Sequence, residues 1–166
     1  MKLNLREIIL FPILSVIMLI SKLLMEFLPN CHLLGVLIVT FTVVFRWKAL
    51  IPIYIYVFLN GLVSGFNVWW VPYLYIWTVL WATAMLIPRF KTQYLNAGFY
   101  IAVCALHGFL FGILYAPVQA LLFGLDFKGT LTWIIAGLPF DVIHGISNFF
   151  CGMLIIPIIK VLQKTK

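Results

Sequence analysis

Long stretches without a charged residue constrain this chain more than any other feature of its 166 residues. No Asp, Glu, Lys or Arg occurs between Lys48 and Arg89, and none occurs between Lys91 and Asp126. Hydrophobic residues make up 65% of the chain and charged residues 9%, and the mean hydropathy is +1.17. A soluble domain of this size cannot bury so much apolar surface. Because the apolar runs are continuous rather than alternating, we predict an all-α integral membrane protein and not a β-barrel.

Basic clusters and turns divide the apolar sequence into six predicted transmembrane helices within a single domain, 1–166. The predicted ranges are 6–28, 32–45, 49–66, 71–88, 94–116 and 139–162. Short turns, "EFLPNCH" and "GFNVWWVP", join the first two pairs, whereas a longer link, "APVQALLFGLDFKGTLTWIIAGLP", joins the last two helices. The first segment has the basic start and apolar core of a signal peptide. No small-residue cleavage site follows it, so we expect it to be retained as the first helix.

The basic residues predict the orientation of the chain. They cluster at the N-terminus, in "RWK", in "PRFK" and at the C-terminus, and six crossings place all these clusters on one side. By the positive-inside rule that side is the cytoplasm, so both termini are predicted to be cytoplasmic. The net charge of +7 therefore indicates orientation and contact with anionic membrane lipid, not nucleic-acid binding.

Polar and ionisable residues lie mostly toward the external ends of the predicted helices, where they are expected to face a cavity or another helix. Asp141, His144 and Asn148 lie on one face of the last helix, at offsets of three and seven. Pro139 suits a first helical turn, which places Asp141 in the first external turn. The other polar candidates are Lys22, Glu26, Asn60, Asn67 and His107.

Several of these residues also have a purely structural interpretation. Lys22 and Glu26 are four residues apart and can neutralise each other. Asn60 can join two helices by hydrogen bonds, and His107 can be a packing residue. Asp141 can be favoured by the helix dipole alone. Their convergence on one side of the membrane is what favours a binding site.

The aromatic run "VWWVPYLYIWTVLW" begins at the same external end. Trp69, Trp70 and Tyr73 can belong to an interfacial aromatic belt. Trp77 and Trp81 continue the run at a spacing of four and form a stripe of large rings. Such a stripe can face lipid or stack against a flat ligand in a pocket, and both alternatives stay open.

Other features indicate packing rather than chemistry. Cys104, Gly108, Gly112 and Ala116 recur at every fourth position, which predicts a close helix–helix contact. The three cysteines lie far apart, without a disulfide or zinc pattern. No P-loop, zinc-protease or hydrolase motif is present. We therefore predict no enzyme activity and no cofactor in this chain, and a dependence on a partner for energy.

This architecture resembles the substrate-binding S components of energy-coupling factor (ECF) transporters, and the likeness covers nearly the whole chain in length and topology. "WIIAGLPFDVIHGISNFFCGMLIIPIIKVL" is similar to the last-helix region of many such components. "HGFLFGILYAPVQALLFGLDFKG" is similar to their fifth helix and the loop after it. The first helix departs from the family because it lacks the A-x-x-x-A motif that docks several members on the coupling subunit. It has only Ser15 and Ser21 as small residues in that region.

The resemblance implies a multi-pass protein of a prokaryotic plasma membrane that captures a vitamin or related micronutrient at an outward-facing pocket. It also implies a transmembrane coupling subunit and two cytoplasmic ATPases as partners, which use ATP while the binding subunit topples in the membrane. The candidate substrate-binding residues are Asp141, His144, Asn148, Asn60, Asn67, Trp69, Trp70, Tyr73, His107, Lys22 and Glu26.

Two other functions remain open from the residues alone. One is a membrane-embedded metal or haem protein, or an enzyme, that uses His107, Asp141 and His144, because Asp and His at this spacing can share a metal. The other is a structural membrane subunit without a ligand, whose polar residues join helices. The aromatic residues favour a ring-bearing ligand, but an acid, imidazoles and amides suit many vitamins and identify none.

Overall fold

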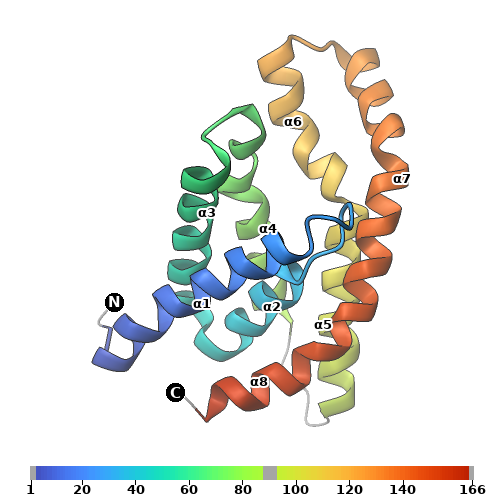
Figure 1. Ribbon diagram of the computed structural model, residues 1–166. Helices are drawn as coiled ribbons and strands as arrows, with labels where there is room; N and C mark the ends of the chain where they lie inside the picture. Colours follow the sequence, from blue (N-terminus) through green and yellow to red (C-terminus); the bar gives the residue numbers. More distant parts are fainter. Residues whose placement is uncertain (1–2, 88–92, 165–166) are drawn as a thin grey trace.

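A computed structural model describes residues 3–87 and 93–164, and its regular elements in these ranges are all helical (Figure 1). Four helical stretches are long and apolar enough to cross a membrane, namely Leu5–Leu24, Leu34–Ser64, Asn96–Phe123 and Phe127–Gln163. The predicted all-helical fold is therefore confirmed for the described residues, and their composition is that of a multi-pass membrane protein. The "PRFK" cluster, Lys2 and Lys166 lie outside the described residues.

The α-helices of the described chain agree with the predicted ranges up to residue 86 and differ after it. They are α1 (Leu5–Leu24), α2 (Leu34–Phe45), α3 (Leu50–Ser64), α4 (Tyr73–Leu86), α5 (Gln93–Phe109), α6 (Phe111–Phe123), α7 (Phe127–Cys151) and α8 (Ile155–Gln163). Three short 3-10 turns, η1 (Arg46–Ala49), η2 (Val68–Trp70) and η3 (Gly152–Leu154), connect some of them.

The predicted link between the last two helices is wrong, because most of it is helical. α6 extends to Phe123, and α7 begins at Phe127 instead of Pro139. Gly124 ends α6 with a left-handed backbone, at a φ of 62°, and the side chain of Asp126 accepts a hydrogen bond from the Gly129 N–H at 2.7 Å. Glycine at a helix end and aspartate before a helix start favour a tight turn between two helices.

The predicted fifth and sixth helices are each bent. Leu110 separates α5 from α6, and η3 separates α7 from α8. Figure 1 shows α8 leaving the axis of α7 and running toward the end of the molecule that carries the N-terminus. The predicted helix 139–162 is therefore the second half of α7 followed by the bend and α8.

α2 lies at the centre of the bundle, where every residue of it except Val43 is buried. An all-round apolar helix is expected in such a position. α2 ends at Phe45, and the next residue, Arg46, has a left-handed backbone with a φ of 55°. Two contacts with α4 hold this conformation: Arg46 Nη2 donates to the Met85 carbonyl at 3.3 Å, and Trp81 Nε1 donates to the Arg46 carbonyl at 3.1 Å.

The predicted close contact of small residues is confirmed between α5 and α7. A Cβ atom added at Gly108 would lie 2.8 Å from Gly145 Cα. Cys104 and Ala116, from the same four-residue repeat, are buried. Because neither glycine has a side chain, the two backbones approach closely at this crossing.

α1 is attached to α3 by polar contacts as well as by apolar packing. The Ser15 hydroxyl is buried and lies 2.9 Å from the Pro52 carbonyl and 2.8 Å from that of Phe11. Near the start of α1, Lys48 Nζ forms an ion pair with Glu7 Oε1 at 2.7 Å. Ser15, one of the two small residues of the first helix, therefore faces α3 and not the outside of the bundle.

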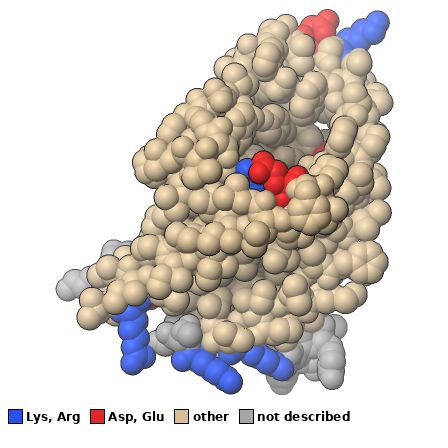
Figure 2. Space-filling view, viewed as in Figure 1, with Lys and Arg blue, Asp and Glu red and all other residues tan. Residues whose placement is uncertain are grey.

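Basic side chains gather near the two termini. The start of α1, η1 and α8 contribute Arg6, Arg46, Lys48, Lys160 and Lys164. Figure 2 shows Lys and Arg atoms at this end of the molecule, with a hollow higher on the same face. At the opposite end, the α6–α7 turn carries Asp126 and Lys128.

Candidate binding site

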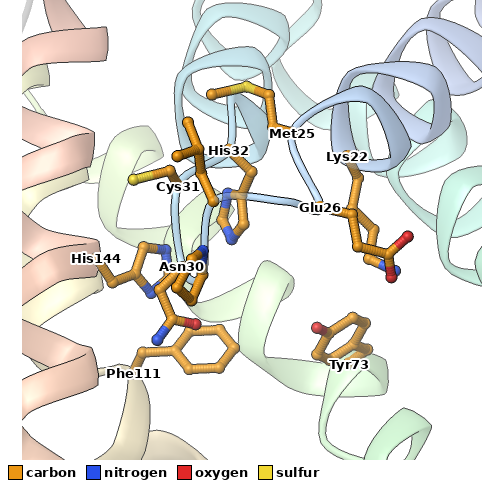
Figure 3. Close-up of a pocket in the computed structure, with 11 residues that line it drawn as sticks. Lys22, Met25, Glu26, Asn30, Cys31, His32, Tyr73, Phe111 and His144 are labelled. Carbon is orange, nitrogen blue, oxygen red and sulfur yellow. The ribbon is translucent and has the colours of Figure 1, made fainter.

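A cavity of about 160 Å³ lies between the α1–α2 loop and the helices α1, α4, α6 and α7 (Figure 3). It is lined by Lys22, Met25, Glu26, Leu28, Pro29, Asn30, Cys31, His32, Tyr73, Phe111 and His144. In Figure 2, acidic and basic side chains meet at the edge of the hollow. Of the predicted site residues, Lys22, Glu26, Tyr73 and His144 line this cavity.

The α1–α2 loop closes one side of the cavity. Pro29 does not fit a helix interior, and Asn30 has a left-handed backbone with a φ of 58°, which asparagine tolerates. Asn30 Nδ2 donates to the Phe140 carbonyl of α7 at 3.3 Å. This bond holds the loop against α7 and brings His32 beside His144.

Imidazole and aromatic rings form a continuous cluster around and beneath the cavity. The ring cluster consists of His32, Tyr73, Trp77, His107, Phe111 and His144. The ring centres of His32 and His144 are 4.7 Å apart, and those of Phe111 and His144 are 4.9 Å apart. Trp77, which is buried, contacts Tyr73 at 5.3 Å and His107 at 5.8 Å. These residues come from the α1–α2 loop and from four helices, α4 to α7.

Several ring nitrogens of this cluster are buried and have no hydrogen-bond partner within the described residues. They are Nδ1 of His32, Nδ1 of His107, Nε2 of His144 and Nε1 of Trp77. The other ring nitrogen of His107 lies 3.2 Å from the Ile76 carbonyl oxygen. A buried polar atom without a partner costs about 1–3 kcal/mol. The cluster therefore favours a ligand or water that supplies partners to these atoms.

His32 lies in the α1–α2 loop and is neutral at pH 7. Burial lowers the pKa of its imidazole from 6.5 to about 4, and the nearby His107 and Lys22 lower it further. A neutral imidazole has one donor nitrogen and one acceptor nitrogen. His32 therefore offers the cavity hydrogen bonding without charge.

Lys22 and Glu26 place opposite charges at the edge of the cavity. Lys22 is half-buried and Glu26 is exposed. The mutual neutralisation that their spacing allows is not seen as a contact, because no ion pair joins these two residues in the described part of the chain. Lys22 Nζ instead lies 5.8 Å from the centre of the Trp69 ring, a cation–π distance. Figure 3 shows both side chains on the side of the cavity away from His144.

Asp141 does not line this cavity, and its predicted position in the first turn of its helix is wrong. Because α7 begins at Phe127, Asp141 lies well inside the helix. Its side chain is buried, and each carboxylate oxygen lies 3.0 Å from the Gly112 nitrogen. Gly112 is the second residue of α6, where backbone N–H groups have no partner within their own helix. Asp141 therefore caps α6.

Asn148 is also buried away from the cavity, at the crossing of α2, α5 and α7. Its Nδ2 donates to the Cys104 carbonyl of α5 at 3.0 Å. A Cβ atom at Gly35 would lie 3.2 Å from this nitrogen, and one at Gly108 would lie 2.9 Å from it. Asp141, His144 and Asn148 are all buried along α7, but of the three only His144 lines the cavity.

The remaining predicted site residues do not line this cavity either. Asn60 is buried in α3, and neither atom of its amide has a partner among the described residues. Trp70 Nε1 donates to a carbonyl of α3 at 2.8 Å, and the Trp69 carbonyl accepts from the Tyr115 hydroxyl at 3.1 Å. Asn67 precedes η2. His107 lies in the ring cluster without lining the cavity.

Sequence reasoning missed two principal wall residues, His32 and Phe111. His32 belongs to "EFLPNCH", a short external turn that combines proline, asparagine, cysteine and histidine, and an imidazole in such a turn was a usable signal. Phe111 had no such signal, since it is one of 15 phenylalanines.

The geometry does not favour the predicted metal alternative. Among the described residues, no group of three or more His, Cys, Asp or Glu side chains is arranged to hold a metal ion. Asp141, one of the three ligands considered, is instead bound to the backbone of Gly112.

No protein-family model, curated protein or solved structure matches this chain. The function proposed below therefore depends on three things: the geometry of the cavity, the distribution of charge, and the resemblance to S components.

Proposed function

We propose that this chain is the substrate-binding S component of an ECF-type importer and captures a small organic micronutrient in the cavity beneath the α1–α2 loop. One observation supports the proposal most directly. The cavity has a positive and a negative side chain at its edge, and its wall includes residues of the ring cluster whose buried nitrogens have no hydrogen-bond partner among the described residues. Concave sites with a few convergent polar groups on an apolar wall are typical of small-molecule binding. Polar groups within membrane helices are costly, which favours a functional reason for so many in one place.

In this proposal the chain crosses a prokaryotic plasma membrane six times, through α1, α2, α3, α4, the bent pair α5–α6 and the bent pair α7–α8. An even number of crossings places both termini on one side. The basic residues near the termini support a cytoplasmic location for that side. The C-terminal end of α1 and the loop after it then face outward, so the cavity receives its ligand from outside the cell.

A transmembrane coupling subunit and two cytoplasmic ATPases supply the energy in this proposal, since the chain carries no nucleotide-binding motif. Ser15 is buried against α3, so docking on the coupling subunit uses other side chains of the bundle. The outward face of α1 is apolar, with Ile9, Ile13 and Ile17 exposed, and supports contact with lipid or with another membrane subunit.

Purification of the tagged chain from cells that express it naturally tests this function. We expect a membrane subunit and two ATPases to co-purify, and a small molecule to be detected by native mass spectrometry. His144→Ala should lose that molecule but keep the partners, because His144 lines the cavity and is 2% exposed. Recovery of the chain without ATPases, together with ligand uptake into proteoliposomes that does not need ATP, would contradict the proposal.

A further inference from the structure

We propose that the cavity binds a small zwitterion with a single ring, an amino-acid-like molecule whose ring carries a hydrogen-bonding atom. This inference rests on the function proposed above and deepens it, because it names the class of molecule that the same cavity takes. Three properties of the cavity carry it: its volume, its two opposite charges and its two histidines.

The volume limits the buried part of the ligand to about one ring. The cavity measures about 160 Å³, whereas an engineered apolar cavity of about 150 Å³ in another protein binds one benzene molecule. Drug-sized ligands occupy pockets of roughly 300–1,000 Å³. Figure 3 shows Phe111 and Tyr73 on one side of the space and His32 on the other, so a flat ring has faces on which to stack.

The charges of the cavity edge match a ligand that carries both signs. Lys22 and Glu26 are four residues apart in the sequence and do not form an ion pair with each other in the described structure. The face of Trp69 lies beside Lys22 Nζ. An amine can therefore pair with Glu26 while a carboxylate on the same ligand pairs with Lys22. A ligand with a single charge leaves one of these two side chains unmatched.

The histidines on the opposite side match a polar atom on the ring. His32 Nδ1 and His144 Nε2 are buried and have no partner among the described residues. His32 is neutral at pH 7, so it can donate to or accept from a hydroxyl or a ring nitrogen. Figure 3 shows Lys22 and Glu26 on the other side of the space from His144. The ligand therefore lies with its ring toward the histidines and its charges toward the end of α1.

Four related compounds test this class on the purified full-length chain in lipid nanodiscs, with binding measured by calorimetry. L-tyrosine has both charges and a ring hydroxyl. Tyramine lacks the carboxylate, 3-(4-hydroxyphenyl)propionate lacks the amine, and L-phenylalanine lacks the hydroxyl. We expect the dissociation constant of L-tyrosine to be at least about tenfold lower than that of each of the other three compounds. Each of these compounds lacks one hydrogen bond, either to a charged side chain or to a buried ring nitrogen, and the loss of one such bond weakens binding by about this factor.

Variants of Glu26 and Lys22 test which side chain contacts the amine of the ligand and which contacts its carboxylate. Glu26→Gln should remove the advantage that the amine gives L-tyrosine over 3-(4-hydroxyphenyl)propionate. Lys22→Met should remove the advantage of the carboxylate over tyramine, and Lys22→Arg should restore it. Lys128→Met, at the exposed α6–α7 turn far along the chain from this site, is the matched control and should leave all four affinities unchanged.

The results separate this inference from the proposed function. Equal affinities for the four compounds, or no binding of any of them, overturn the zwitterion class. If a different molecule then co-purifies with the chain and is lost in His144→Ala, the importer function stands without that class. If L-tyrosine binds as expected but no ATPase co-purifies and no ATP-dependent uptake occurs, the class stands and the importer function fails.

Discussion

Asp141 and His144 are neighbours on one face of α7, but they meet different surroundings. The carboxylate of Asp141 accepts from the Gly112 N–H, and the imidazole of His144 reaches the cavity. Gly112 permits the first contact, because a Cβ atom there would collide with the carboxylate. Phe111 precedes Gly112 and lines the cavity. Asp141 therefore holds the backbone next to Phe111, whose ring lines the cavity.

Replacement of Asp141 tests this positioning role. Asp141→Ala removes the acceptor for the Gly112 N–H, and the loss of a helix cap costs about 0.5–2 kcal/mol. At about 2–4 °C per kcal/mol for a chain of this size, the melting midpoint in nanodiscs should fall by several degrees. Ligand binding should weaken as well, because Phe111 is no longer held.

Asp141→Asn is the matched control, since its amide oxygen can still accept the bond. It should recover most of the stability and the affinity. If Asn behaves like Ala, the negative charge of Asp141 matters and the hydrogen bond does not. If neither substitution changes the melting midpoint, Asp141 does not hold α6 in place.

Among the helices, the pair α5 and α7 shows most directly how small residues control the architecture. Gly108 and Gly145 meet where the two helices cross. On α7, Gly137 has nothing within 4 Å of the position of a Cβ atom. Gly108 is therefore required for the close approach of two helices. Gly137 has no such contact and only lowers the stability of its helix.

Alanine substitutions at Gly108 and Gly137 separate these two effects. Gly108→Ala inserts a methyl group 2.8 Å from Gly145 Cα and should destabilise the protein by about 1–3 kcal/mol. Gly137→Ala should stabilise it by about 0.5–1 kcal/mol, through the better helix propensity of alanine. Thermal melting of both variants in nanodiscs measures the difference, and equal melting midpoints would contradict the close crossing of α5 and α7.

At the scale of the whole molecule, charge is distributed along one axis. Basic side chains gather at the end that carries both termini, and the α6–α7 turn at the opposite end carries Asp126 and Lys128. In a bilayer this distribution favours the terminal end on the cytoplasmic side. Figure 2 shows acidic and basic atoms at the edge of the hollow between these two ends.

Cysteine labelling in intact cells tests the orientation. Lys128→Cys should react with a membrane-impermeant maleimide added outside, because Lys128 is exposed in the first turn of α7. Lys164→Cys, near the end of the described chain, should react only after the cells are opened. The unmodified protein, with its own three cysteines, gives the background. Labelling of both variants in intact cells would contradict cytoplasmic termini.

The sequence predicted elements better than it predicted the site. Proline at position 139 was interpreted as a helix start, yet membrane helices tolerate proline internally because neighbouring groups satisfy the freed backbone. Gly124 and Asp126 were the stronger boundary signals, since they form the end of α6 and the start of α7. The sequence analysis singled out Lys22, Glu26, Tyr73 and His144, which line the cavity, but it did not single out His32 and Phe111, which line it as well.

Hydropathy, charge and helical periodicity are local properties, so the sequence by itself determined that this chain is helical and apolar enough to cross a membrane. Periodicity also determined that Asp141, His144 and Asn148 share one face of a helix. Only the tertiary structure decided which of them lines the cavity, because the partner of each comes from another part of the fold. α6 brings a backbone N–H to Asp141, α5 brings a carbonyl to Asn148, and the α1–α2 loop brings His32 to His144. The hydrogen bonds of Asp141 and Asn148 join helices, whereas the buried Nε2 of His144, which lines the cavity, has no partner among the described residues.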